Sequence, residues 1–136
     1  LRNVTPEEIK EAETILADEN SSSKDRFFAN RTIQTSKQTA KTTEIEIQTF
    51  ELGNVAVVGL PGEIFVELGL EIKNKAPVEH TFMNTLCNNS IYGYVCTRVA
   101  YDQGGYEPRL SLARVPVDAG EQFVATALDM LNGGDK

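Results

Sequence analysis

The chain has 136 residues, 40% of them hydrophobic and 24% charged. This length and composition suit one globular domain with a real core, rather than two comfortable ones. The formal net charge of −7 disfavours binding to a nucleic-acid backbone, because such a site needs clustered lysines and arginines. No apolar run approaches the roughly 20 residues of a membrane span, and none resembles a signal peptide. The chain begins at Leu1 without an initiator methionine, so we expect a processed or truncated piece.

Cysteine and histidine are both scarce in this chain. Cys87 and Cys96 flank a turn-rich piece, where they could meet across a hairpin or stay as two separate buried thiols. His80 is the single histidine, whereas a catalytic zinc site draws on two or three His, Asp or Glu side chains. The chain therefore cannot form a His-rich metal site alone, and we give His80 no metal role.

The front third is polar and predicts peripheral helices. Thr5, Pro6 and Glu8 form a strong helix start, because Thr5 can cap, Pro6 suits the first helical position and Glu8 completes a capping box. This pattern predicts a helix over 5–19. A weaker helix is expected over 24–35, followed by a Thr/Lys/Gln-rich connection. We interpret 1–43 as a peripheral helical segment with a polar linker.

The middle of the chain predicts strands. Alternating residues over 44–52, with Ile45 and Ile47 on one face, indicate a half-exposed strand. The following apolar run over 54–60 indicates a second strand, and the intervening Gly-Asn pair favours an antiparallel hairpin. A further strand is expected over 79–87.

A helix is predicted over 62–75, because Ile64, Leu68 and Ile72 recur every four residues. Pro61 and Gly62 separate this helix from the preceding strand. Glu63 is expected in its first turn, at the carboxyl end of that strand, where ligands bind in open α/β sheets. For an isolated glutamate, the simpler interpretation is a charged residue at the start of a helix that has no other function.

The remaining segments complete an α/β pattern. Residues 91–95 are expected as a strand or loop edge, and 98–103 as a brief helix. Asp118 and Glu121 repeat the capping-box spacing ahead of a helix over 118–132. The expected fold class is α/β, with a mixed or mostly antiparallel sheet and packed helices. Residues 44–136 form this α/β part.

Few residues offer chemistry. No glycine-rich phosphate loop or GxSxG elbow is present. Glu63 would approach Tyr92 and Tyr94 if the strands over 55–59 and 79–87 lie side by side. By residue type alone, the favoured interpretation of these tyrosines is half-buried aromatic rings whose hydroxyl groups contact solvent.

Four blocks of sequence give a more specific indication. They are Val57-Val58-Gly59-Leu60-Pro61-Gly62-Glu63-Ile64-Phe65, Leu86-Cys87-Asn88, Tyr94-Val95-Cys96-Thr97 and Tyr101-Asp102-Gln103-Gly104-Gly105-Tyr106-Glu107. In order and spacing they resemble the neutral/alkaline (non-lysosomal) ceramidases, over roughly Glu44 to Leu131. The resemblance implies the C-terminal part of a catalytic domain.

The resemblance also implies half an active site. In that family an amide hydrolase holds one Zn²⁺ with two histidines, a glutamate and a tyrosine. The glutamate matches Glu63, and the tyrosine matches Tyr94; one extra residue after Asn88 leaves Tyr92 as the alternative. The histidines, the nucleophilic serine and the oxyanion-stabilising groups have no match here, so no catalytic residue is assigned. Since two oxygen ligands hold zinc weakly, we expect the isolated chain to lack the metal.

Two functions from different classes follow. The first is the C-terminal part of a zinc-dependent amide hydrolase acting on an N-acyl amide or sphingolipid-type substrate, inactive without its N-terminal half. The alternative is a non-catalytic α/β interaction or binding domain that kept the fold. The expected partner is the missing N-terminal half, or a second copy through exposed apolar surface. The resemblance favours a secreted or periplasmic location.

Overall fold

The computed structural model describes residues 1–88 and 93–134. The chain divides into two compact units, Leu1–Thr43 and Glu44–Lys136. Within the described residues, no helix has the length and apolar character needed to cross a membrane.

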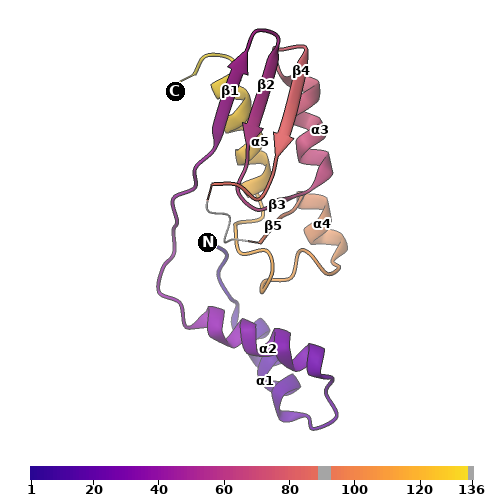
Figure 1. Cartoon of the computed structure of the whole chain (residues 1–136). Helices are drawn as coiled ribbons and strands as arrows, with labels where there is room; N and C mark the ends of the chain where they lie inside the picture. The colour runs from indigo at the N-terminus through magenta and orange to yellow at the C-terminus, as the bar shows by residue number, and fades with distance from the viewer. Residues whose placement is uncertain (89–92, 135–136) are drawn as a thin grey trace. The chain divides into compact units, whose positions relative to one another are not determined.

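The first unit is a pair of helices, α1 (Pro6–Ala17) and α2 (Ser23–Ser36) (Figure 1). The expected capping box is confirmed, because the Glu8 backbone N–H donates to the Thr5 hydroxyl at 3.2 Å and the Thr5 N–H donates to the Glu8 carboxylate at 2.8 Å. Ala12 and Ala29 are the buried residues of the two helices. With so small a buried surface, this unit depends strongly on its helix caps.

The second unit contains a three-stranded sheet in the order β1-β2-β4. Its strands are β1 (Gln48–Leu52), β2 (Val55–Gly59) and β4 (His80–Asn84). The first pair is antiparallel, as expected for a hairpin, and the second pair is parallel. The α/β class with a mixed sheet is therefore confirmed.

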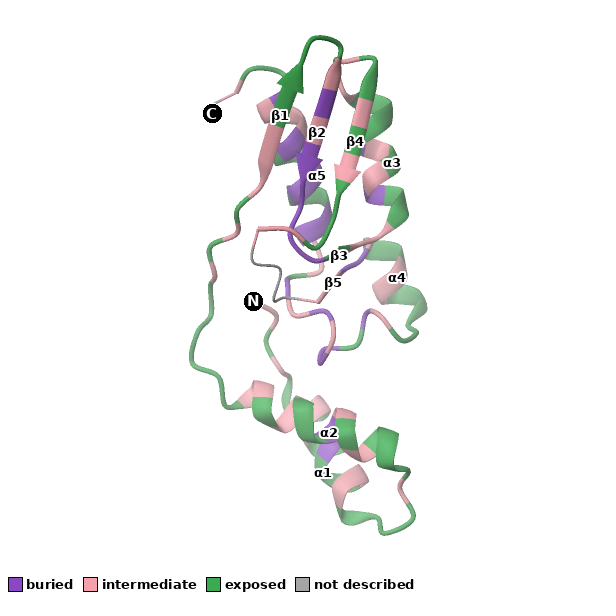
Figure 2. Ribbon diagram, in the orientation of Figure 1, coloured by how far each residue is buried: buried purple, intermediate pink, exposed green. Residues whose placement is uncertain are grey.

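Two long helices, α3 (Val66–Lys75) and α5 (Ala119–Leu131), cover one face of this sheet (Figure 1). A short helix, α4 (Arg98–Gln103), lies between these two helices in the chain order. The core lies between helices and sheet and is seen as the buried segments of Figure 2. Its fully buried side chains include Val58, Leu60 and Ile72.

The other face of the sheet carries an apolar row. The strand register places Phe50, Val57 and Phe82 side by side across β1, β2 and β4. Both phenylalanines are exposed, at 64% and 58%, while Ala56 and Val58 on the opposite face are buried. We call Phe50, Val57 and Phe82 the outer row. It leaves apolar surface open on this face, as expected from the sequence.

The strands are shorter than the sequence predicts. The expected strand over 44–52 begins only at Gln48, which pairs with Gly59, the last residue of β2. The chain turns away after Gly59, so no strand among the described residues pairs with 44–47, although Ile45 and Ile47 still pack on the core. The strand expected over 79–87 ends at Asn84 for the same reason, because Asn84 also pairs with Gly59.

One helix start and one helix cap differ from expectation. Helix α3 begins at Val66 rather than at 62, with Phe65 as its N-cap, so Glu63 does not lie in a helical turn. Helix α5 begins where expected, but Asp118 makes no side-chain cap. The Asp118 backbone has φ −96° and ψ 7° rather than the extended conformation of an N-cap, and its carboxylate accepts from the Gln122 side chain at 2.9 Å.

Candidate metal centre

Glu63 and Tyr94 lie in two very short parallel strands, β3 (Glu63–Ile64) and β5 (Tyr94–Val95). They are register partners in this ladder, so their side chains leave neighbouring strands on the same face. The Glu63 N–H donates to the Gly93 carbonyl at 2.9 Å, which fixes the register at this end. The structure thus brings together the two residues that the sequence singled out as metal ligands.

Two glycines permit this close pairing. Gly62 has φ +97°, and a Cβ there would lie 2.8 Å from the Gly93 carbonyl oxygen. Gly93 has φ +73°, and a Cβ there would overlap the Leu112 carbonyl oxygen. Because only glycine fits such contacts, the backbones on either side of the site can approach within hydrogen-bonding distance.

Neighbouring segments brace both strands. The Leu86 N–H donates to the Gly62 carbonyl at 3.0 Å, on the Glu63 side. On the other side, the Tyr94 N–H donates to the Leu112 carbonyl at 2.9 Å. The two-residue ladder is therefore held in place by longer segments rather than by its own length.

The electrostatics of the pair are set by proximity. A side-chain hydrogen bond with Glu63 is the largest cause that raises the pKa of Tyr94 above its ordinary value. Desolvation and the negative charge of Glu63 act in the same direction, followed by smaller contributions from Tyr106 and Glu107. In the metal-free chain, Tyr94 is thus held as a neutral phenol at physiological pH.

A cavity of about 500 Å³ opens at this pair. Glu63 and Tyr94 line it together with Glu107, which comes from the loop after α4. Tyr106 packs edge-on against the Tyr94 ring, with centroids 6.3 Å apart. These contacts bring a second carboxylate and a second phenol to the neighbourhood of the pair.

The donor set fits part of a zinc site. Zn²⁺ accepts carboxylate oxygens and commonly takes four ligands. Glu63 and Tyr94 provide two oxygen donors on one face, and both line the same cavity. Among the residues described, no group of three or more His, Cys, Asp or Glu side chains could hold a metal ion. A complete site would need ligands from outside this cluster.

The other residues considered from the sequence lie elsewhere. Tyr92, the alternative to Tyr94, falls outside the described residues. His80 is exposed at the start of β4, with Nε2 3.6 Å from a Glu79 carboxylate oxygen. Cys87 and Cys96 are both thiols, so they do not form a bridge.

Sequence reasoning missed Glu107 and Leu86 as residues of this cavity. Glu107 lies in a stretch without clear periodicity, and its approach depends on a loop contact that no local pattern encodes. Both residues did stand in the blocks that carried the family resemblance. Their place in these blocks is the sequence feature that points to them.

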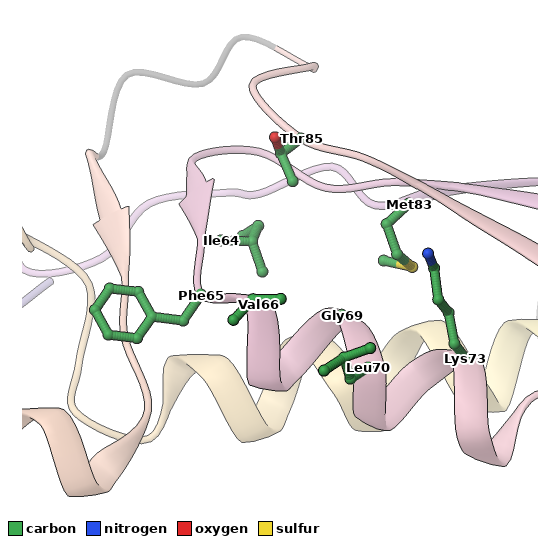
Figure 3. Close-up of a pocket in the computed structure, with 8 residues that line it drawn as sticks. All are labelled: Ile64, Phe65, Val66, Gly69, Leu70, Lys73, Met83 and Thr85. Atoms are coloured by element: carbon green, nitrogen blue, oxygen red, sulfur yellow. The ribbon is translucent and has the colours of Figure 1, made fainter.

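An apolar groove of about 230 Å³ adjoins the cavity (Figure 3). It lies between α3 and β4, with Val66 and Leu70 on the helix and Met83 on the strand. Lys73 stands at its far end (Figure 3). The groove and the cavity share lining residues, which are Ile64, Phe65, Val66 and Thr85.

Comparison with known proteins gives one likeness of fold. No protein-family model matches the chain, and no curated protein matches it. The crystal structure of neutral ceramidase from Pseudomonas aeruginosa is similar at 23% identity, over 66% of this chain and 16% of that chain, with a TM-score of 0.47. The chain thus spans a small part of that protein's length. This likeness concerns the fold and says nothing of activity.

Proposed function

We propose that this chain is the C-terminal part of the catalytic domain of a zinc-dependent amide hydrolase similar to neutral ceramidases. Residues 44–136 would form that part, and 1–43 a peripheral helical attachment. The observation that carries the proposal is the register pairing of Glu63 with Tyr94. These are the two residues that the sequence resemblance matches to metal ligands.

In this proposal, Glu63 and Tyr94 supply two oxygen ligands of the zinc ion. When bound, zinc would polarise an amide carbonyl and activate a nucleophile. Their register pairing places both side chains on the cavity, where both would hold the ion. The other half of the domain would provide two histidines and a serine nucleophile. Substrates would be N-acyl amides, including sphingolipid-type amides.

Calorimetric titration with ZnCl₂ tests the role of the pair. The 136-residue chain is expected to bind Zn²⁺ weakly, because it offers two ligands of four. Glu63→Gln and Tyr94→Phe should each lower the affinity by roughly tenfold, as expected for loss of one ligand interaction of about 1.4 kcal/mol. Glu51→Gln, an exposed carboxylate on β1, is the matched control and should leave the affinity unchanged. Equal affinity in all four proteins would rule out the assigned ligands.

A second candidate function is a non-catalytic interaction domain that kept the fold. The outer row favours it, because exposed phenylalanines on a sheet face mark a surface that another layer can cover. The same row would also suit the missing half of a catalytic domain. The reading frame upstream of Leu1 discriminates the two candidates: a histidine-rich region with a serine nucleophile supports the hydrolase, and its absence supports the interaction domain.

A further inference from the structure

Leu86 has a backbone conformation that leucine rarely adopts. Its φ is +58°, in the left-handed region, where a side chain with a Cβ is strained. Among the described residues, the other non-glycine with positive φ is Asn88, and asparagine tolerates this region well. Leu86 is therefore the unusual case.

Hydrogen bonds to the preceding turn impose this conformation. The Leu86 N–H donates to the Gly62 carbonyl at 3.0 Å, and the Cys87 N–H donates to the Leu60 carbonyl at 3.4 Å. The Cys87 thiol also donates to the Leu60 carbonyl, at 3.3 Å. The segment that follows β4 is thus tied to the turn that carries Glu63.

Burial does not compensate for the strain, because the Leu86 side chain is 63% exposed. It lines the cavity that also contains Glu63 and Tyr94. A glycine or asparagine would fit this backbone better, and a polar residue would suit the exposure better. Strained residues that persist without a packing role cluster at ligand sites.

The surroundings of Leu86 indicate what it contacts. From the cavity, the shared residues Ile64, Phe65 and Val66 lead into the apolar groove of Figure 3. A ligand whose polar group lies at Glu63 and Tyr94 would therefore meet apolar surface directly beside that group. Leu86 lines the cavity with Glu63 and Tyr94 but does not line the groove, so it would meet the part of an apolar substituent nearest the polar group.

We propose that Leu86 is a specificity-determining residue, which contacts the apolar substituent of an amide ligand held at Glu63 and Tyr94. This inference rests on the proposed function for the location of the polar end. It adds that Leu86 itself makes this contact, and that its strained backbone serves it.

The test compares two primary amides, hexanamide and acetamide, in nuclear magnetic resonance titrations of the ¹⁵N-labelled 136-residue chain. We expect hexanamide to bind roughly tenfold more tightly, because its extra methylenes are partly buried against Leu86 and the neighbouring apolar residues of the cavity. Leu86→Asn and Leu86→Gly should remove this preference, and Leu86→Met should keep it. Leu52→Asn, an exposed leucine on β1 outside the cavity, is the matched control and should change nothing.

Thermal melting of the same variants separates a binding role from a structural one. Leu86→Asn should melt at or above the wild-type temperature, since asparagine adopts the left-handed conformation at lower cost. A lower melting temperature together with an unchanged hexanamide preference would overturn the inference. An equal affinity of wild type for both amides would overturn it as well.

The titrations are run with and without ZnCl₂, so that the two proposals fail separately. If the chain prefers hexanamide through Leu86 but binds no zinc, the inference stands and the proposed metal site is rejected. Zinc binding that depends on Glu63, without a preference for hexanamide, would support the metal site and reject the role of Leu86.

Discussion

Glu63 and Tyr94 are register partners in two parallel strands of two residues each, and interaction with the Glu63 side chain raises the pKa of Tyr94. Such a short ladder would not persist alone. It is held by Gly62 and Gly93, which allow the backbones to approach, and by hydrogen bonds to Leu86 and Leu112.

The pairing predicts an altered titration of Tyr94. Ultraviolet absorbance is titrated against pH for wild type and for Tyr94→Phe. The difference between the two curves should show a phenol that ionises above the ordinary tyrosine pKa of about 10. Glu63→Ala should bring that pKa back towards the ordinary value, because it removes both the hydrogen bond and the charge. Glu67→Ala is the control, since Glu67 lines the same cavity but does not raise the pKa of Tyr94.

The same shift gives a sign for stability. A raised folded-state pKa means that the folded chain holds the Tyr94 proton more tightly than the unfolded chain. The resulting stabilisation is fully present below the ordinary tyrosine pKa and is lost as the pH rises through the folded-state value. The melting temperature of wild type should therefore approach that of Tyr94→Phe in strongly alkaline buffer. A gap that widens with alkaline pH would contradict the hydrogen bond.

Substitution of two glycines separates backbone strain from crowding. Gly53 and Gly62 both have positive φ, but a Cβ at Gly53 would meet nothing within 4 Å, whereas one at Gly62 would press on the Gly93 carbonyl. We expect Gly53→Ala to lower the free energy of unfolding by about 1 kcal/mol, and Gly62→Ala by roughly 2–4 kcal/mol. Urea denaturation provides the measurement, and similar losses in both variants would show that the close approach at Gly62 is unimportant.

The division into two units predicts a local effect of the first helix cap. Thr5→Ala should cost the helix pair about 1 kcal/mol, because it leaves the Glu8 N–H without its acceptor. The core of the second unit contains no residue before Ile45, so its stability should not change. Amide hydrogen exchange can follow both units in one sample. Faster exchange in β2 of the variant would contradict independent units.

The proposed function predicts that the 136-residue chain has no amidase activity. Its candidate ligand set is incomplete, and no nucleophile is matched to the family pattern. Fluorogenic N-acyl amides with added ZnCl₂ should release no product above the buffer rate. Turnover that requires zinc and is lost in Glu63→Gln would show that the chain holds a complete site, and would overturn this view.

Local patterns predicted most of the elements in this chain. The helix over 98–103 and the hairpin around Gly53 were found at the right positions, because capping residues and turn residues act within a few positions. The pairing of Glu63 with Tyr94 was anticipated from a resemblance in sequence, not from periodicity. Such a resemblance can carry information about contacts between distant segments.

The errors arose where distant segments decide the structure. Ile64 fits a helical pattern, yet it pairs with Val95 and becomes strand, and the helix starts at Val66. The contribution of Glu107 could not be seen in the sequence, because it depends on how the loop after α4 returns to the cavity. The spacing of residues along the chain does not reveal either contact, because both join segments that are distant in sequence.

The outer row has a consequence for handling the chain in solution. Phe50 and Phe82 present aromatic surface on a sheet whose outer strands have open edges, a combination that invites intermolecular stacking. Near neutral pH, mutual repulsion between chains of net charge −7 opposes such stacking. Acidification to the isoelectric point, about pH 4.7, brings the net charge to zero and removes that repulsion. Mild acid should therefore turn a well-dispersed sample turbid before the fold itself is lost.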